Sequence, residues 1–250
     1  MAHAYLDEHL GALAVGEEHT VEGAEAEHAG RVARLRIGEQ ILMLNGNGLR
    51  VSCEVTHTDK GAFSVKAVGE TTSVERPHPG LHLVQALAKG GRDEQAIQTA
   101  TELGAMQITP WQSERCVVRW NAQKAIKQVQ RWQQIVREAS KQSLRAFMPT
   151  VNSLANTSAL CELAARTTAT VLVLDPTATE SLLDIPLTAS DEYALIVGPE
   201  GGISDAELAA LASAGAIRVR LGSGIMRTST AGPAAIAALH TRQGTWDTDR

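Results

Sequence analysis

Residues 194–205 read ALIVGPEGGISD, an apolar run that ends in Gly-Pro-Glu-Gly-Gly and is followed at once by a Ser-Asp pair. The apolar run predicts a buried strand over residues 193–197. Ser204 with Glu207 three residues later is the pattern of a capping box, which marks the start of a helix. The stretch therefore predicts a strand, a glycine-rich loop and a helix in succession.

This loop is a candidate ligand site. Open α/β sheets bind ligands at the carboxyl ends of their strands, and glycines there let a ligand approach the main chain. The alternative is a tight turn that needs glycine only for its backbone angles. The loop lacks the spacing G-x-G-x-x-G, and the chain contains no G-x-x-x-x-G-K-[ST], so neither standard phosphate loop is present.

The rhythm of strand and helix extends over most of the chain. Strand-like runs cover residues 81–88, 105–111, 170–175, 192–198 and 216–222, and helical patterns cover residues 93–104, 121–143, 204–215 and 231–243. This alternation predicts a largely parallel sheet covered by helices. The long segment 121–143 repeats apolar residues at spacings of three and four, which predicts a buried helix face made of Ala122, Ile126, Val129, Trp132, Val136 and Ala139.

The first seventy residues have a different pattern. Residues 39–55 (EQILMLNGNGLRVSCEV) place two strand-like runs around an Asn-Gly turn, which predicts a hairpin, and residues 62–68 (AFSVKAV) add an alternating segment. The Pro-bearing stretch 71–80 (TTSVERPHPG) is typical of a linker. We therefore expect a small β-rich domain over residues 1–73 and a larger α/β domain over residues 74–250.

Composition narrows the class of protein. The chain has 250 residues, 44% of them hydrophobic, with a net charge of −5, which suits a globular protein. No apolar run is long enough for a membrane helix, the first residues do not resemble a signal peptide, and the spacing of cysteines and histidines matches no metal site. We expect a cytoplasmic protein without membrane attachment or metal.

Positive charge is concentrated in one segment. Residues 111–145 contain eight basic and two acidic residues, whereas residues 1–27 contain seven acidic residues and no Lys or Arg. A stripe of this kind is typical of a phosphate-binding face or of a solvated helix surface, and the sequence does not decide between the two.

A second glycine-containing loop lies one strand further along, in residues 221–235 (LGSGIMRTSTAGPAA). It contains one arginine, Arg227, and three hydroxyl residues, Thr228, Ser229 and Thr230, which are expected to cap the last helix. Because parallel strands end at the same edge of a sheet, both loops are expected to lie there.

Together these blocks resemble one protein family. The segments LIVGPEGGISDAEL and VRLGSGIMRTSTA are similar to the signature of the RsmE family, which methylates N3 of a uridine in 16S ribosomal RNA of the small subunit. Residues 88–120, residues 131–149 and the N-terminal HAGRVARLRIGEQILMLNGNG (28–48) resemble further blocks of the family in the same order. The likeness covers nearly the whole chain.

The resemblance implies a fold and a cofactor. The C-terminal domain is expected to be a SPOUT-type α/β fold with a trefoil knot, and the N-terminal domain a PUA-like β-barrel that contacts RNA. The resemblance also implies a homodimer and S-adenosylmethionine as methyl donor.

It also implies site residues. The expected catalytic residues are Arg227, which would stabilise charge on a uracil carbonyl or hold a phosphate, and Glu200, as base, cofactor contact or support for the second loop. The expected cofactor-binding residues are Leu174, Gly198, Pro199, Glu200, Gly201, Gly202, Leu221, Gly222, Ile225, Met226, Arg227, Thr228, Thr230 and Ala231, with Asp175 beside Leu174 at the start of a third loop. The expected RNA-binding residues are His28, Arg31, Arg34, Arg36, Arg115, Lys124, Lys127, Arg131 and Arg145.

Two positions depart from the family pattern. Ser229 stands where a glutamate is usual, and Thr99 stands where a lysine is usual. The first departure favours an alternative function, that of a non-catalytic RNA-binding or ribosome-assembly factor with the same fold. A second alternative is an α/β enzyme acting on a small metabolite, which the acidic net charge favours but no catalytic motif does.

Overall fold

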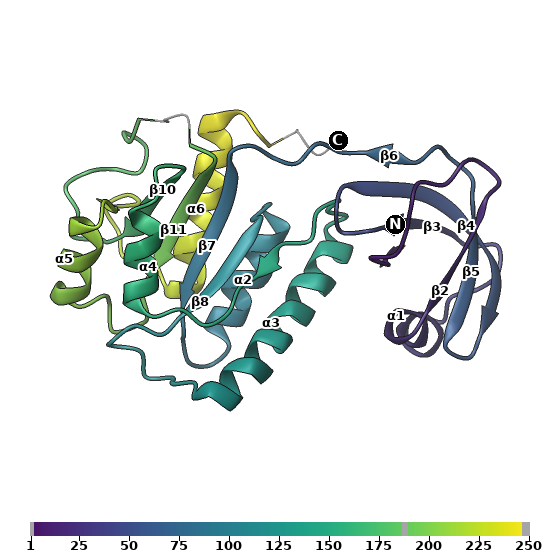
Figure 1. Cartoon of the computed structure of the whole chain (residues 1–250), viewed down its shortest axis with the longest axis horizontal. Coiled ribbons are helices and arrows are strands. Elements are labelled where there is room, and N and C mark those ends of the chain that lie inside the picture. The colour runs from purple at the N-terminus through teal and green to yellow at the C-terminus, as the bar shows by residue number, and fades with distance from the viewer. Residues whose placement is uncertain (1–2, 187–189, 247–250) are drawn as a thin grey trace. The chain divides into compact units, whose positions relative to one another are not determined.

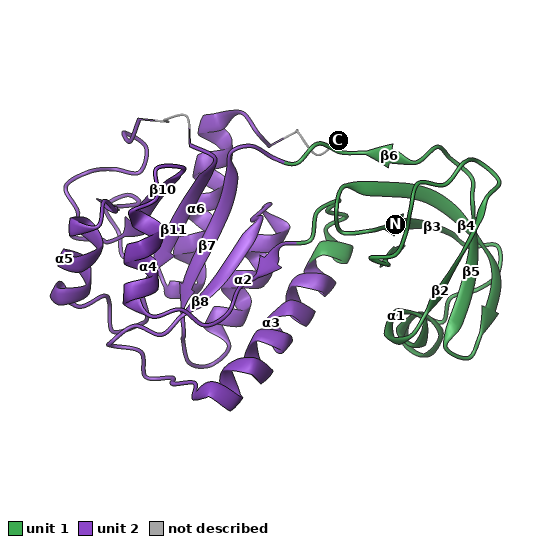
Figure 2. Cartoon of the chain, in the orientation of Figure 1, with its two compact units in different colours: residues 1–76, 140–148, 249–250 green, residues 77–139, 149–248 purple. Residues whose placement is uncertain are grey.

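The structure is a computed structural model that describes residues 3–186 and 190–246. The described chain forms two compact units (Figure 2). Unit 1 comprises residues 3–76 and 140–148, and unit 2 comprises residues 77–139, 149–186 and 190–246. No described helix is both long enough and apolar enough to cross a bilayer.

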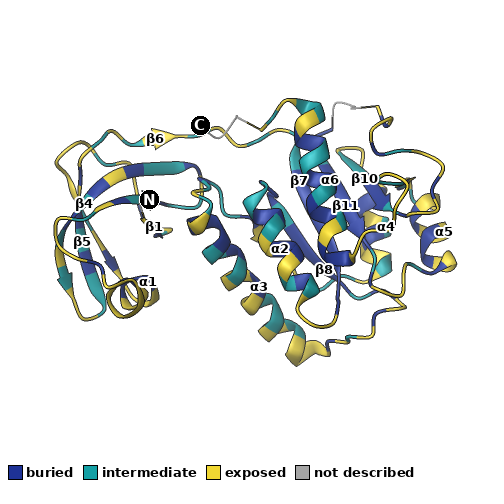
Figure 3. Ribbon diagram, turned by 180° about the vertical axis from the view of Figure 1, so that it is seen from behind, coloured by how far each residue is buried: buried dark blue, intermediate teal, exposed yellow. Residues whose placement is uncertain are grey.

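Unit 2 is built on a six-stranded sheet in which every neighbouring pair is parallel, as predicted (Figure 1). The strand order is β12-β10-β11-β7-β8-β9. The strands are β7 (Gly80–Ala86), β8 (Gln107–Trp111), β9 (Thr150–Val151), β10 (Ala169–Leu174), β11 (Glu192–Val197) and β12 (Ile217–Val219). The central strands are buried almost completely, which explains why they appear in the sequence as continuous apolar runs (Figure 3).

Helices cover both faces of this sheet (Figure 1). The helices α2 (Arg92–Glu102) and α6 (Thr228–Gln243) pack together on one face, whereas α4 (Thr157–Ala164) and α5 (Asp205–Ser213) pack together on the other. Gly232 lets α6 approach the sheet, since a Cβ at this position would lie 2.6 Å from Cδ1 of Leu83 on β7.

The long helix α3 (Ala122–Gln142) was predicted correctly, but its predicted buried face was wrong over the first turns. Trp132, Val136 and Ala139 are buried, whereas Ala122 and Ile126 are exposed, Ile126 to 63%. Periodicity shows which residues share a face of a helix, and it does not show whether another element covers that face.

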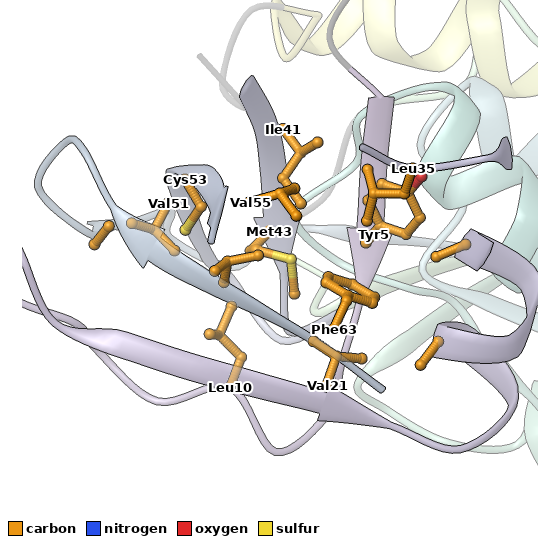
Figure 4. Close-up of a cluster of buried hydrophobic side chains, with 14 residues drawn as sticks. Tyr5, Leu10, Val21, Leu35, Ile41, Met43, Val51, Cys53, Val55 and Phe63 are labelled. Atoms are coloured by element: carbon orange, nitrogen blue, oxygen red, sulfur yellow. The ribbon is translucent and has the colours of Figure 1, made fainter. Parts of the chain in front are cut away.

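Unit 1 is a mixed sheet with strand order β1-β3-β4-β5-β2, and β6 pairs with β4. The strands are β1 (His3–Leu6), β2 (Glu18–Glu22), β3 (Gln40–Leu44), β4 (Leu49–Asp59), β5 (Ala62–Ala67) and β6 (Thr72–Ser73), and they are accompanied by α1 (Ala24–His28) and the π-helical turn η1 (Ala29–Ala33). The predicted hairpin is β3–β4, whose turn is held by Asn45 Oδ1 accepting from the backbone N–H groups of Asn47 and Leu49. Fourteen buried side chains, including Tyr5, Met43 and Phe63, form the hydrophobic core of unit 1 (Figure 4).

The last residues of α3 and the chain that follows belong to unit 1. The buried Lys141 Nζ donates to both carboxylate oxygens of Glu25, at 3.1 and 3.2 Å. Gly48 lies against Phe147, whose ring would come within 2.9 Å of a Cβ at position 48. The expected division at residue 73 considered only neighbours in sequence, so it did not include this returning segment.

Candidate functional site

A cavity of about 540 Å³ lies at the edge of the unit 2 sheet where β10, β11 and β12 end. Three loops form it: residues 175–177 after β10, residues 198–203 after β11 (the first loop) and residues 220–227 after β12 (the second loop). The lining residues are Arg92, Arg115, Leu174, Asp175, Pro176, Thr177, Val197, Gly198, Pro199, Glu200, Gly202, Ile203, Asp205, Leu208, Leu221, Gly224, Ile225, Met226, Arg227, Thr228 and Ala231. A cavity of this size and composition suits a ligand with an apolar body and a few polar groups.

The first loop has the predicted structure. Ser204 caps α5, its side chain accepting from the backbone N–H of Glu207 while the Glu207 carboxylate accepts from the backbone N–H of Ser204. Gly198 is packed so closely that a Cβ there would lie 2.7 Å from Ile203 Cγ1, and Gly202 has φ +74°, a conformation that favours glycine. The loop therefore requires glycine at these positions for its own shape.

The two loops are joined through Thr228. Its hydroxyl donates to the backbone oxygen of Gly198 at 2.8 Å and accepts from Nε2 of Gln85 on β7, also at 2.8 Å. The prediction that hydroxyl side chains cap the last helix was wrong, because α6 begins at Thr228 with Arg227 as the residue that precedes it, and no side chain caps it. The Thr228 hydroxyl instead forms a hydrogen bond that connects the start of α6, directly after the second loop, to the first loop.

Arg227 lies at the start of α6 and lines the cavity. It is exposed, and its guanidinium makes no hydrogen bond to any residue that the structure describes. Ile225 and Met226, which precede it in the second loop, are also exposed. The second loop therefore presents a cation and two apolar side chains toward solvent and the cavity.

Glu200 is already paired within the protein. Its Oε1 accepts from the backbone N–H of Lys89 at 3.1 Å and from Arg92 Nη1 at 3.0 Å. Burial by itself would raise the pKa of the Glu200 carboxyl, but hydrogen bonds from its own N–H, from Lys89 and from Arg92, with the charge of Arg92, lower that pKa below its ordinary value. Glu200 is thus a stable carboxylate that connects the first loop to the start of α2.

The loop after β10 is fixed by Asp175. Its Oδ1 accepts from the backbone N–H and the hydroxyl of Thr177, and its Oδ2 accepts from Nε of Arg218 at 2.8 Å. Burial would raise the pKa of Asp175, but these hydrogen bonds and the charge of Arg218 lower it. The acid therefore shapes the wall of the cavity next to Leu174.

Arg115, which was predicted to bind RNA, lines the cavity. Its Nη1 lies 3.4 Å from the backbone oxygens of Gly201 and Ile203, and a Cβ at Gly201 would lie 3.3 Å from the Arg115 Cβ. Gly201 lies against Arg115 and does not line the cavity.

Most of the predicted cofactor residues come together. The predicted residues that line the cavity are Leu174, Gly198, Pro199, Glu200, Gly202, Leu221, Ile225, Met226, Arg227, Thr228 and Ala231, whereas Gly201, Gly222 and Thr230 do not line it. Sequence reasoning missed Arg92, Pro176, Thr177, Val197, Ile203, Asp205, Leu208 and Gly224. Arg92 had a detectable signal, since Gly90 and Gly91 after β7 form a further glycine-containing loop in front of a helix, and both have positive φ.

The other predicted RNA-binding residues lie in both units. His28, Arg31, Arg34 and Arg36 are exposed on or just after α1 and η1, and Arg145 lies in the segment of unit 1 that follows α3. Lys124, Lys127 and Arg131 are exposed on α3. Arg131 is not available as a free cation, because its guanidinium donates to both carboxylate oxygens of Glu94.

Two domain models match the chain. A model described as an RNA methyltransferase domain matches residues 75–240, and one described as an RNA methyltransferase PUA domain matches residues 21–68. The first contains every residue that lines the cavity.

Individual proteins and structures are similar over almost the full length. The ribosomal RNA small subunit methyltransferase E of Mycobacterium bovis is 41% identical over 95% of this chain and 89% of its own, and that of Bacillus subtilis is 30% identical over 88% of both. The crystal structure of the Neisseria gonorrhoeae enzyme of this name, bound to S-adenosylmethionine, covers 97% of this chain and 98% of its own, with a TM-score of 0.85 and 30% identity. A putative methyltransferase from Legionella pneumophila with bound S-adenosylmethionine has the same TM-score at 28% identity and the same coverage.

Proposed function

The chain belongs to the ribosomal RNA small subunit methyltransferase E family, and on that premise we propose that it methylates N3 of a uridine in the 16S RNA of the small subunit. It is an rRNA methyltransferase that uses S-adenosylmethionine. The observation that carries the proposal is the cavity at the carboxyl edge of the sheet, because it is built from the three loops that contain most of the expected cofactor residues.

The residues present fit the cofactor. Apolar side chains of Leu174, Val197 and Leu221 supply a surface for an adenine ring, and the backbone of the two glycine-containing loops supplies polar groups nearby. Gly198 and Gly202 keep the first loop in a shape that side chains would prevent. When bound, S-adenosylmethionine supplies an electrophilic methyl group and leaves as the neutral thioether.

The residues of the chain then act on the acceptor. The uracil N3 must lose its proton as it becomes methylated, so negative charge develops on the uracil ring and its carbonyl oxygens. Arg227 suits the stabilisation of this charge, because a guanidinium stays protonated and this one has no partner among the described residues. We assign Arg227 as a catalytic residue on this basis.

Glu200 suits a positioning role better than that of the base. Its lowered pKa makes it a weak proton acceptor, and one oxygen is already occupied by Lys89 and Arg92. Ser229, at the position of the usual family glutamate, is buried in the first turn of α6 and does not line the cavity. We therefore propose that the proton leaves to water at the cavity.

Contacts with RNA are proposed for the exposed basic residues of both units. Phosphate groups are negatively charged and the same in every RNA sequence, so binding them requires only suitably placed cations. Arg31, Arg34 and Lys127 supply such cations. We also propose that the protein acts as a homodimer, as the family resemblance implies. Because its substrate is ribosomal RNA, we propose that it acts in the cytoplasm.

The test is methylation by the purified protein. Small-subunit rRNA, both free and assembled into subunits, is incubated with S-adenosylmethionine, and its nucleosides are analysed by mass spectrometry. We expect 3-methyluridine with the wild-type protein and a decrease of about 10²-fold in rate for Arg227→Ala, with cofactor affinity retained. Cofactor binding without any methylation of either substrate would instead support a non-catalytic assembly factor.

A further inference from the structure

Arg92 is a cavity residue that the sequence did not single out. It is the first residue of α2 and lies after the Gly90–Gly91 turn that follows β7, the strand beside β11 in the sheet. Its side chain is 34% exposed and lines the same cavity as Arg227. The two arginines therefore reach one cavity from different loops.

Glu200 fixes the orientation of Arg92. The carboxylate joins Arg92 Nη1 at 3.0 Å to the backbone N–H of Lys89 at 3.1 Å, and the Glu200 side chain is only 22% exposed. A guanidinium has five N–H donors in a planar fork, and only one of its nitrogens is engaged among the described residues. The remaining donors are left at the cavity wall in an arrangement that Glu200 holds.

Two other charged residues of the cavity, Arg115 and Asp175, have different partners. Arg115 lies within hydrogen-bonding distance of the backbone oxygens of Gly201 and Ile203, and Asp175 is held by Arg218, which does not line the cavity. Arg92 differs from Arg115 because the partner of Arg92 is a carboxylate, which holds the guanidinium in place through Nη1 and leaves its other N–H groups available. A cation held in this way loses less side-chain entropy when it binds an anionic oxygen than a freely rotating arginine would.

We propose that Arg92 contacts an anionic oxygen of the target nucleotide, and that Glu200 acts through Arg92 as a positioning residue. This rests on the proposed function. The oxygen belongs either to the uracil, where charge develops as N3 loses its proton, or to a phosphate of the nucleotide. The guanidinium N–H groups of Arg92 can donate to either kind of oxygen, and the pH dependence of kcat and KM distinguishes the two cases.

The test uses the full-length protein with small-subunit rRNA and follows cofactor affinity, kcat and KM as a function of pH. The variants are Arg92→Gln, Arg92→Lys and Glu200→Gln, and the matched control is Arg166→Gln, which removes an exposed arginine that does not line the cavity. We expect all four variants to bind S-adenosylmethionine within about threefold of wild type. We expect Arg92→Gln to lower kcat/KM by about 10²-fold, Arg92→Lys to restore part of it and Glu200→Gln to have a smaller effect in the same direction.

The pH profile identifies the oxygen. If Arg92 contacts the uracil, the loss is in kcat and shrinks as the pH rises toward the pKa of the uridine N3–H, because the anion then forms without help. If Arg92 contacts a phosphate, the loss is in KM for RNA and does not depend on pH in this way. Either pattern supports the proposal, and a purely structural role would produce neither.

Two results would overturn it. One is Arg92→Gln with the same kcat/KM as Arg166→Gln, and the other is a loss of activity matched by an equal loss of cofactor affinity. Because the wild-type protein is assayed in parallel for 3-methyluridine, a failure of the proposed function itself would appear as an inactive wild type and is distinguishable from both.

Discussion

The hydroxyl of Thr228 donates a hydrogen bond to the backbone oxygen of Gly198 across 2.8 Å, and so joins the first residue of α6 to the first loop. The same hydroxyl accepts from Gln85 Nε2 on β7. Thr228 is buried, so these bonds are shielded from water. One side chain therefore sets the relation between the two glycine-containing loops and a central strand.

Replacing Thr228 by Val should loosen both loops. Valine has nearly the same shape but cannot bond to Gly198, so the free energy of unfolding is expected to fall by about 1–3 kcal/mol and the affinity for S-adenosylmethionine to fall with it. Thermal denaturation and titration calorimetry measure the two effects. Thr230→Val is the control, because Thr230 lies two residues further along α6, is exposed and does not line the cavity. Equal behaviour of both variants would show that the Thr228 bonds do not hold the loops.

Asp175→Asn should remove a pH-dependent part of the stability. The pKa of Asp175 is lowered in the folded protein, so its ionised form favours folding above the unfolded pKa of about 3.9, and this contribution is lost as the pH falls through the lower folded value. The difference in unfolding free energy between wild type and Asp175→Asn should thus be constant near neutral pH and shrink below about pH 4. The exposed Asp184 provides the control variant, Asp184→Asn, for which denaturant unfolding should show little difference at any pH. A difference for Asp175→Asn that does not change with pH would refute the role of its charge.

Gly232→Ala should destabilise unit 2. A Cβ at this position would lie 2.6 Å from Leu83 Cδ1 and 3.2 Å from Val197 Cγ2, both in a fully packed core. The crowding is expected to cost about 1–3 kcal/mol, more than the roughly 1 kcal/mol that alanine contributes to a helix. In Gly224→Ala the new Cβ meets nothing within 4 Å, so its melting temperature should remain close to that of wild type. An unchanged or higher melting temperature for Gly232→Ala would mean that α6 does not approach β7 this closely.

If exposed basic residues of α3 contact RNA phosphates, RNA binding should depend on them in a way that changes with salt concentration. Lys127 is exposed, so its replacement by Gln should weaken RNA binding and make log K less dependent on log salt by about one unit of slope. Cofactor affinity should not change. The control Lys60→Gln removes an exposed lysine from the β4–β5 turn of unit 1 and should leave the slope as it is. If both variants give the wild-type slope, Lys127 contacts no phosphate.

The features that sequence reasoning predicted correctly depend on neighbours along the chain. The capping box joins Ser204 to Glu207, three positions further on, and the β3–β4 hairpin is closed by Asn45, which bonds to Leu49 four positions further on. The buried parallel strands appear as apolar runs because both of their faces are covered. Local signals of this kind were sufficient to place two loops at one edge of the sheet.

The features that it missed depend on contacts distant in sequence. Lys141 and Glu25 are 116 residues apart and Arg92 and Glu200 are 108 apart, and nothing near either residue of a pair identifies its partner. The exposure of Ile126 has the same origin, since it depends on what covers α3. For this reason the sequence suggested Glu200 as a possible base, whereas the structure shows a carboxylate already bound to Arg92.

The central claim is that this chain methylates uridine N3 in small-subunit rRNA, and the most direct test is nucleoside mass spectrometry of that rRNA from cells with and without the gene. We predict that 3-methyluridine disappears in the deletion, returns with the wild-type gene and does not return with Arg227→Ala produced at the same level. Persistence of 3-methyluridine in the deletion strain would contradict the account.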